Sequence, residues 1–229
     1  MPVRKKAPED LTAKKALALE VIQRLKAEYP DAGCTLDYDH AWQLLVSVRL
    51  AAQCTDARVN IVVEELFAKY PSVAALAAAE PEDIEAIVKP CGLGHSKARD
   101  ISACMRMLRD KYDCRVPNTF EELLALPGVG RKSANLIMGD VFGKPAIVTD
   151  THCIRLCNKI GLVDGIKEPQ KVEMALWKII PPEEGSDLCH RFVMHGRAVC
   201  NARKPECEKC CLKDICRAAR EAAGQQAEL

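Results

Sequence analysis

LPGVGRKSA, at residues 126–134, is the most informative run of the chain, because it joins two helical patterns through a Gly-x-Gly turn. Before it, Thr119 and Glu122 have the spacing of a capping box, which predicts a short helix from Phe120 to Leu126. After it, helix-forming residues continue from Arg131 to Phe142. Two glycines separated by one residue permit a tight turn, and because they have no side chains they leave the backbone exposed. The run predicts a helix-hairpin-helix motif. Such a motif binds the DNA backbone without reading the base sequence, and here the contacts would come from Gly128, Gly130 and Arg131.

Helical patterns recur along the rest of the chain, and strand patterns are almost absent. Apolar residues repeat at helical spacing in two clear stripes, residues 59–67 and 101–112. Further helix-start signals stand at Thr55, Ser72, Pro81, Asp150, Pro169 and Ser186. The sequence therefore predicts an all-α fold of roughly ten short helices joined by turns.

Composition places the chain among globular proteins of one or two domains. It has 229 residues, of which 48% are apolar and 28% charged. The most apolar stretch, residues 44–54, contains Arg49 and is too short to span a bilayer. No apolar stretch near the start is long enough for a signal peptide. We expect no membrane association and a cytoplasmic location, in the nucleoid of a bacterium or the nucleus of a eukaryote.

Charge alone does not predict a nucleic-acid partner, because the net charge is only +1. The charges are unevenly distributed: residues 80–85 are acidic, whereas residues 191–220 hold eight basic side chains against three acidic ones. A basic end on a neutral protein fits one-sided contact with a polyanion. An ordinary solvated surface explains the same pattern equally well.

Lys132 and Asp150 are the candidate catalytic pair, eighteen residues apart. Lys132 falls in the first turn of a helix beside Arg131, where the positive helix end and a neighbouring cation both disfavour an ammonium group. A lysine must lose its proton before it can attack carbon. Taken separately, Lys132 reads as a phosphate contact and Asp150 as a helix cap. Their pairing with the hairpin makes both catalytic candidates.

Thirteen cysteines is a high count, and most of them look like small core residues. Their odd number without a secretion signal argues against a disulfide framework. Four near the C-terminus are separated by six, two and five residues, which lets their thiolates close around one metal centre: Cys200, Cys207, Cys210 and Cys216. A zinc site is the alternative, although zinc ribbons usually have two Cys-x-x-Cys knuckles and this segment has one. Arg203 and Lys204 lie between the first two cysteines and could contact phosphate.

The chain resembles the endonuclease III family of DNA glycosylases from about Ala16 to Arg217. The resemblance rests on the hairpin run, on the cysteine spacing and on three further segments: AQCTD at 52–56, GLGHSKA at 92–98 and VTDTH at 148–152. It implies a DNA glycosylase with abasic-site lyase activity, acting as a monomer on duplex DNA that holds oxidised or ring-damaged pyrimidines or abasic sites.

Particular residues take roles from this resemblance. Lys132 matches the family's nucleophile and Asp150 its catalytic carboxylate. Gln53 matches the side chain that fills the hole left by a flipped nucleotide, and Leu93 the wedge that enters the base stack. His152 falls in the matching DNA-binding segment. By the same resemblance, the four spaced cysteines hold a [4Fe–4S] cluster. Without it, Gln53 would read as a polar helix end and Leu93 as a core leucine.

The resemblance also implies two helical domains with a DNA-binding cleft between them. Residues 34–144 would form a six-helix domain with the hairpin, and residues 1–33 with 145–229 a split domain that carries the cluster. The chain departs from the family pattern in small ways: Cys54 stands where alanine is common, Gly94-His95 replaces a bulkier pair, and Ser133 replaces threonine. These departures bear on lesion range and opposite-base preference and leave the reaction class intact.

Three other functions fit part of the pattern. Monofunctional glycosylases of the same superfamily share the hairpin and the cluster but lack a lysine at the position of Lys132. A non-catalytic DNA-binding module would need the hairpin but not Asp150 at its spacing. A redox carrier would explain the cysteines and leave the hairpin unexplained.

Overall fold

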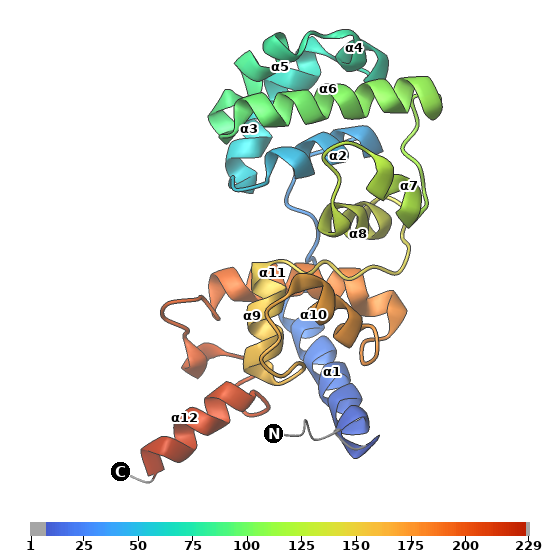
Figure 1. The fold of residues 1–229 in the computed structure, drawn as a ribbon. Coiled ribbons are helices and arrows are strands. Elements are labelled where there is room, and N and C mark those ends of the chain that lie inside the picture. The colour runs from blue at the N-terminus through green and yellow to red at the C-terminus, as the bar shows by residue number, and fades with distance from the viewer. Residues whose placement is uncertain (1–7, 228–229) are drawn as a thin grey trace, which may run out of the picture. The chain divides into compact units, whose positions relative to one another are not determined.

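The computed structural model describes residues 8–227, and this part of the chain is helical throughout (Figure 1). It contains twelve α-helices and three short 3-10 helices, and none of its residues forms a strand. The all-α prediction is confirmed, although the described part has more helices than the roughly ten expected. None of these helices is long and apolar enough to cross a membrane.

The chain divides into two compact units. One is the continuous segment Cys34–Lys144, and the other joins Met1–Gly33 to Pro145–Leu229. We call the first the hairpin unit and the second the split unit.

The hairpin unit contains seven α-helices, so the expected number of six is wrong. Their bounds are α2 (Ala41–Leu50), α3 (Asp56–Lys69), α4 (Val73–Ala78), α5 (Pro81–Val88), α6 (Gly94–Lys111), α7 (Phe120–Ala125) and α8 (Arg131–Asp140), with the 3-10 helix η1 (Lys89–Cys91) before α6. Two of the seven, α4 and α5, are separate because Glu80 precedes Pro81 and takes an extended conformation. A residue before proline is restricted to that region.

The starts of these helices follow the sequence signals. The side chains of Thr55, Ser72 and Thr119 each accept a hydrogen bond from the backbone N–H three residues on. The longest helix, α6, packs against α4, α5 and α2. The core between them is built from fully buried apolar side chains, among them Leu44, Leu50, Leu66, Leu76, Ile84, Met105 and Leu108.

The split unit is built from α1 (Pro8–Glu28), α9 (Thr151–Ile160), α10 (Pro169–Leu176), α11 (Gly185–Ala198) and α12 (Arg217–Ala227), with the 3-10 helices η2 (Pro182–Glu184) and η3 (Cys207–Lys209). Both α1 and α9 pack against α11. The prediction that a helix opens at Ser186 is off by one residue, because α11 continues from η2 and begins at Gly185. Asp150 caps α9 and Gly161 ends it in a left-handed conformation, as the sequence predicts.

The turn between α7 and α8 fits only a glycine at position 128. Gly128 has a φ of +76°, and a Cβ built on it would lie 2.9 Å from Cβ of Asp100 and 3.0 Å from Cδ of Arg49. These two residues form an ion pair, with Arg49 Nη2 2.7 Å from Asp100 Oδ2, that joins α2 to α6. The hairpin turn therefore packs directly on this ion pair.

Gly130 has no such constraint. Its φ of −96° is open to any residue, and an added Cβ would meet nothing within 4 Å. The fold itself therefore does not require glycine at the second position of the turn, and its expected role in exposing the backbone to phosphate stays a prediction.

This difference gives a matched pair of variants. Gly128→Ala should lower the free energy of unfolding by about 2–4 kcal/mol, because left-handed strain adds to a steric clash. Gly130→Ala should change it by less than about 0.5 kcal/mol. Urea denaturation of both variants measures the difference, and equal stabilities would contradict the packing of the turn on Arg49 and Asp100.

Candidate active site

Lys132 is exposed and occupies the second position of α8, directly after the Gly-x-Gly turn. Its neighbour Arg131 lies over the ring of Phe120, with 4.8 Å between the guanidinium carbon and the ring centroid. This contact ties the start of α8 to α7. Gly130, the N-terminal cap of α8, leaves the space beside this helix end open, because a Cβ added to it would meet nothing within 4 Å. A lysine amine and the positive end of a helix are thus presented together.

Asp150 is the N-terminal cap of α9, as one reading of the sequence proposed. Its Oδ1 accepts a hydrogen bond of 2.7 Å from the backbone N–H of Cys153. Its Oδ2 lies 3.3 Å from Nδ1 of His152, and the carboxylate side chain is 16% exposed. Capping occupies one oxygen, so the second is available for chemistry. The two roles considered for Asp150 are therefore compatible.

His152 and Arg155 fix α9 to the end of α11. A Cβ on Gly196 would come within 2.5 Å of the His152 ring, so this glycine makes room for the imidazole. Arg155 Nη2 donates to the carbonyl oxygens of Gly196 and Cys200, at 3.2 and 2.9 Å. The helix that begins at Asp150 is thereby joined to the first of the four spaced cysteines.

Gln53 and Leu93 share an unusual backbone. Gln53 has a φ of 57° and Leu93 a φ of 52°, and both are exposed. Leu93 is 58% exposed, so the alternative reading of a core leucine is wrong. Residues other than glycine rarely take this conformation, and such strain is often found at functional sites. The hairpin unit therefore presents both side chains on strained, outward-facing turns.

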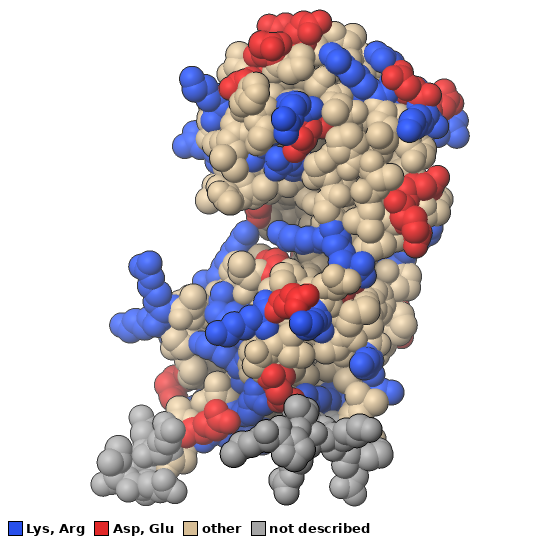
Figure 2. Space-filling view, viewed as in Figure 1, with Lys and Arg blue, Asp and Glu red and all other residues tan. Residues whose placement is uncertain are grey.

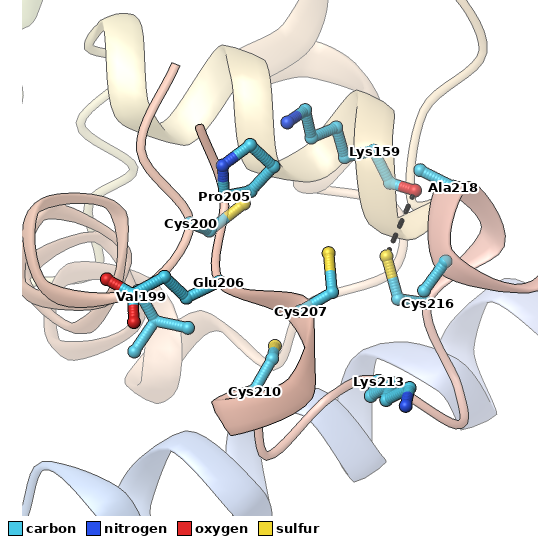
Figure 3. A pocket seen from close by; sticks show the side chains of 11 residues that line it. Lys159, Val199, Cys200, Pro205, Glu206, Cys207, Cys210, Lys213, Cys216 and Ala218 are labelled. Carbon is cyan, nitrogen blue, oxygen red and sulfur yellow. Dashed lines mark hydrogen bonds between the residues drawn. The ribbon is translucent and has the colours of Figure 1, made fainter. Parts of the chain in front are cut away.

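The four spaced cysteines line a cavity of about 220 Å³ in the split unit (Figure 3). Their side chains come from the end of α11, from η3 and from the turn before α12, and they project toward the cavity, together with Lys159 of α9. Among residues 8–227, no three His, Cys, Asp or Glu side chains are grouped closely enough for a single metal ion. The four cysteines line one cavity, and the prediction that their thiolates close around one metal centre stays a prediction.

Polar groups surround these thiols. Cys210 Sγ lies 3.3 Å from Nε2 of His195, whose Nδ1 is 3.1 Å from the hydroxyl of Tyr29. Cys216 Sγ donates a 3.5 Å hydrogen bond to the carbonyl oxygen of Lys159, drawn as a dashed line in Figure 3. Burial raises the pKa of Cys210 to about 11. A metal must therefore displace a firmly held proton, so loading should release protons.

Arg203 and Lys204 are exposed on the loop that connects Cys200 to Cys207. The Asn201 side chain accepts a 2.7 Å hydrogen bond from the Lys204 backbone, which holds the loop in a tight turn. In the hairpin unit, acidic side chains gather over the α4–α5 end (Figure 2), where Glu80, Glu82 and Asp83 are exposed. The basic loop with Arg203 and Lys204 therefore belongs to the split unit, whereas the acidic α4–α5 end belongs to the hairpin unit.

The structure places Lys132 in the hairpin unit and Asp150 in the split unit. It also shows a residue that sequence reasoning missed, the fully buried Lys97 of α6. Lys97 Nζ donates 2.8 Å hydrogen bonds to the carbonyl oxygens of Leu50 and Cys91, and burial lowers its pKa. The signal was present, because Lys97 falls four residues before Ile101 on a buried apolar stripe.

Comparison with known proteins defines the class. The chain matches the HhH-GPD superfamily base excision DNA repair protein family over residues 46–182, a range that includes the hairpin, Lys132 and Asp150. Endonuclease III of Synechocystis sp. is 42% identical over 207 residues, covering 90% of this chain and 94% of that protein. Endonuclease III of Escherichia coli strain K12 is 38% identical over 202 residues, covering 88% and 95%.

A solved structure agrees with these relatives. It is a trapped endonuclease III–DNA covalent intermediate, an estranged-adenine complex, which superposes with a TM-score of 0.86 at 39% identity. The match covers 91% of this chain and 98% of the other. The protein is therefore a helix-hairpin-helix base excision repair enzyme, a DNA glycosylase with abasic-site lyase activity. Within that class it belongs to the endonuclease III family.

Proposed function

We propose that this enzyme removes oxidised or ring-damaged pyrimidines from duplex DNA and then cuts the abasic site, with Lys132 as its nucleophile. One observation carries the proposal: an exposed lysine in the first turn of the hairpin's second helix. A similar solved structure, at 39% sequence identity, is an endonuclease III trapped covalently on DNA.

Lys132 drives both steps in this proposal. Its neutral amine attacks C1′ of the sugar, and the bond between C1′ and the base breaks with its electron pair leaving on the base. The C1′–O4′ bond then breaks as the nitrogen forms its second bond to C1′, and O4′ takes up the proton that the amine has lost. The Schiff base that results acidifies the hydrogen on C2′. Loss of that proton expels the 3′ phosphate by β-elimination.

Asp150 supports the same chemistry through Oδ2. As the base leaves, positive charge develops on the sugar, and a carboxylate nearby stabilises it or accepts the proton from Lys132. The capping bond from Cys153 fixes the orientation of the carboxylate. His152, 3.3 Å from Oδ2, holds the second oxygen in place and is exposed enough to reach DNA.

DNA must be opened before the damaged base can be reached. We assign Gln53 to the hole left by the flipped nucleotide and Leu93 to the base stack, because both are exposed on strained turns. The backbone of the hairpin turn at Gly128 and Gly130 would contact DNA phosphate, as would Arg203 and Lys204. The enzyme would act as a monomer on chromosomal DNA, in the nucleoid of a bacterium or the nucleus of a eukaryote.

The cysteine cavity fits a [4Fe–4S] cluster better than zinc. A zinc ion bound by four thiolates has bonds of about 2.3 Å, which would leave almost no space between the sulfurs. A cavity of about 220 Å³ has room for several atoms. Cys200, Cys207, Cys210 and Cys216 would hold the cluster, which would cross-link α11, η3 and the start of α12. Arg155 would connect this cross-linked region to α9 and Asp150, because it donates a hydrogen bond to the carbonyl oxygen of Cys200.

The first test addresses the nucleophile. With wild-type enzyme and DNA that contains thymine glycol, borohydride should reduce the Schiff base and leave a covalent protein–DNA band. Lys132→Gln should lose the band and still bind DNA, because the hairpin amides remain. Lys111→Gln, which changes another exposed lysine of the hairpin unit, is the control and should trap normally. A band that persists in Lys132→Gln would assign the nucleophile to another amine.

The second test separates capping from catalysis at Asp150. Asp150→Asn keeps a capping oxygen, so stability should hold while base release slows by about a hundredfold or more. Asp150→Ala should slow base release as much and also lose about 1 kcal/mol of stability with the cap. Single-turnover assays and thermal unfolding measure the two effects. A normal rate in Asp150→Asn would leave the residue as a helix cap alone.

The third test addresses the cluster. Purified protein should be yellow-brown with broad absorbance near ~400 nm, as iron–thiolate clusters are. Cys207→Ala should lose this colour, because its side chain lines the cavity. Cys211→Ala should keep it, because Cys211 lies outside the cavity lining and its carbonyl oxygen accepts a hydrogen bond from Arg24. A colourless wild-type protein with stoichiometric zinc would contradict the assignment.

A further inference from the structure

The exposed turns of Gln53 and Leu93 follow two different helical segments of the hairpin unit. Gln53 comes three residues after Leu50, the last residue of α2. Leu93 comes two residues after Cys91, the last residue of η1, and directly before α6. Within the unit, α6 packs against both α2 and η1 (Figure 1). A residue that joins the end of α2 to the end of η1 would therefore fix one turn relative to the other.

Lys97, the fourth residue of α6, makes this connection. Its Nζ donates 2.8 Å hydrogen bonds to the carbonyl oxygens of both Leu50 and Cys91. Its backbone N–H donates a further hydrogen bond of 3.0 Å to the carbonyl oxygen of Leu93 itself. This single residue thus holds the end of α2, the end of η1 and the turn that presents Leu93.

The burial of Lys97 indicates that these hydrogen bonds matter more than the volume that the side chain fills. Lys97 is fully buried, so its ammonium group loses the water that would otherwise hydrate it. An apolar side chain of similar length would fill the same space without that desolvation cost. Only a donor group, however, can hold two carbonyl oxygens at once. The position therefore favours a side chain that fixes the geometry of the two segments.

Both turns depend on such support, because each contains a strained residue. Gln53 has a φ of 57° and Leu93 a φ of 52°. Residues other than glycine persist in this region only where the surrounding structure holds them there. Lys97 supplies support from the buried side, whereas Gln53 and Leu93 are exposed. The exposed side chains thus remain available to contact DNA.

We propose that Lys97 is a positioning residue for the opening of duplex DNA, and that its hydrogen bonds keep the Gln53 and Leu93 turns at the spacing needed to enter one lesion site together. The proposal rests on the roles proposed above for Gln53 and Leu93. Because Lys97 is fully buried, it acts through these turns and not by contact with DNA. Without its hydrogen bonds, each turn keeps its sequence but loses its fixed position relative to the other.

The loss of Lys97 should be selective for duplex DNA. A nucleotide in a duplex must be unpaired and unstacked, whereas an abasic site in a single strand is already accessible. Filling the hole and wedging the base stack are needed only in the duplex. A general loss of folded enzyme would instead lower the rates on both substrates equally. The ratio of the duplex rate to the single-strand rate therefore reports positioning.

Single-turnover cleavage of abasic-site DNA by saturating enzyme, on a duplex and on a single strand, tests this selectivity. Lys97→Met keeps the length of the side chain and removes its donors. Its ratio of duplex rate to single-strand rate should fall about tenfold, the scale expected when hydrogen bonds from a charged group are lost. Met105→Ala is the matched control, because it empties fully buried volume further along α6 and should leave the ratio unchanged. A wild-type ratio in Lys97→Met would overturn the proposal.

Lys97→Gln keeps the test decisive if Lys97→Met does not fold. Its side chain is one bond shorter and retains two N–H donors for the same carbonyl oxygens. The ratio should fall by about threefold, because hydrogen bonds between neutral groups contribute less than those from a charged donor. A wild-type ratio in Lys97→Gln would then overturn the proposal.

A fluorescence measurement separates this proposal from the proposed function. 2-Aminopurine beside a non-cleavable abasic-site analogue becomes brighter when its stacking is lost, so it reports opening of the duplex by saturating enzyme. Leu93→Ala should abolish the increase, Lys97→Met should reduce it, and Met105→Ala should retain it. A normal increase in Leu93→Ala would overturn the role of Leu93 and with it this proposal. A lost increase in Leu93→Ala beside a normal one in Lys97→Met would overturn the proposal for Lys97 alone.

Discussion

The turn between α7 and α8 takes its shape only because position 128 has no side chain. Gly128 lies against the ion pair of Arg49 and Asp100, which joins α2 to α6. This contact fixes the start of α8, where Lys132 is presented. The same two helices lead into the turns of Gln53 and Leu93, which Lys97 braces from within. One packed junction in the hairpin unit therefore sets the backbone of three candidate site residues.

In the split unit, the two carboxylate oxygens of Asp150 have different partners. One carboxylate oxygen caps α9 and the other faces His152, so a structural bond orients the carboxylate that we propose to be catalytic. Arg155, one turn further along α9, reaches the carbonyl oxygen of Cys200. Disorder around the cysteine cavity would therefore disturb α9, the helix that Asp150 caps. A cluster at that cavity would thus be connected to the proposed catalytic carboxylate through Arg155, even without a redox role.

The local sequence signals predicted most of the helices and the parts of the site that depend on neighbours in sequence. Caps at Thr55, Ser72, Thr119 and Asp150 acted as expected, because capping is decided within three or four residues. The buried Lys97 was missed, because its hydrogen bond to the carbonyl oxygen of Leu50 joins residues 47 apart that meet only in the fold. The fold requires glycine only at position 128, so the expected contact of Gly130 with DNA stays a prediction. The roles of Gln53 and Leu93 came from family resemblance, and their strained backbone could not be read from composition.

The central claim is that the amine at position 132 attacks the sugar. The most direct measurement is to reduce the wild-type enzyme with borohydride on a short lesion duplex, digest protein and DNA, and locate the residual sugar adduct by mass spectrometry. The account predicts one modified peptide, with the added mass on Lys132 and a missed cleavage at that lysine. An adduct on any other residue, or strand cleavage without an adduct, would contradict it.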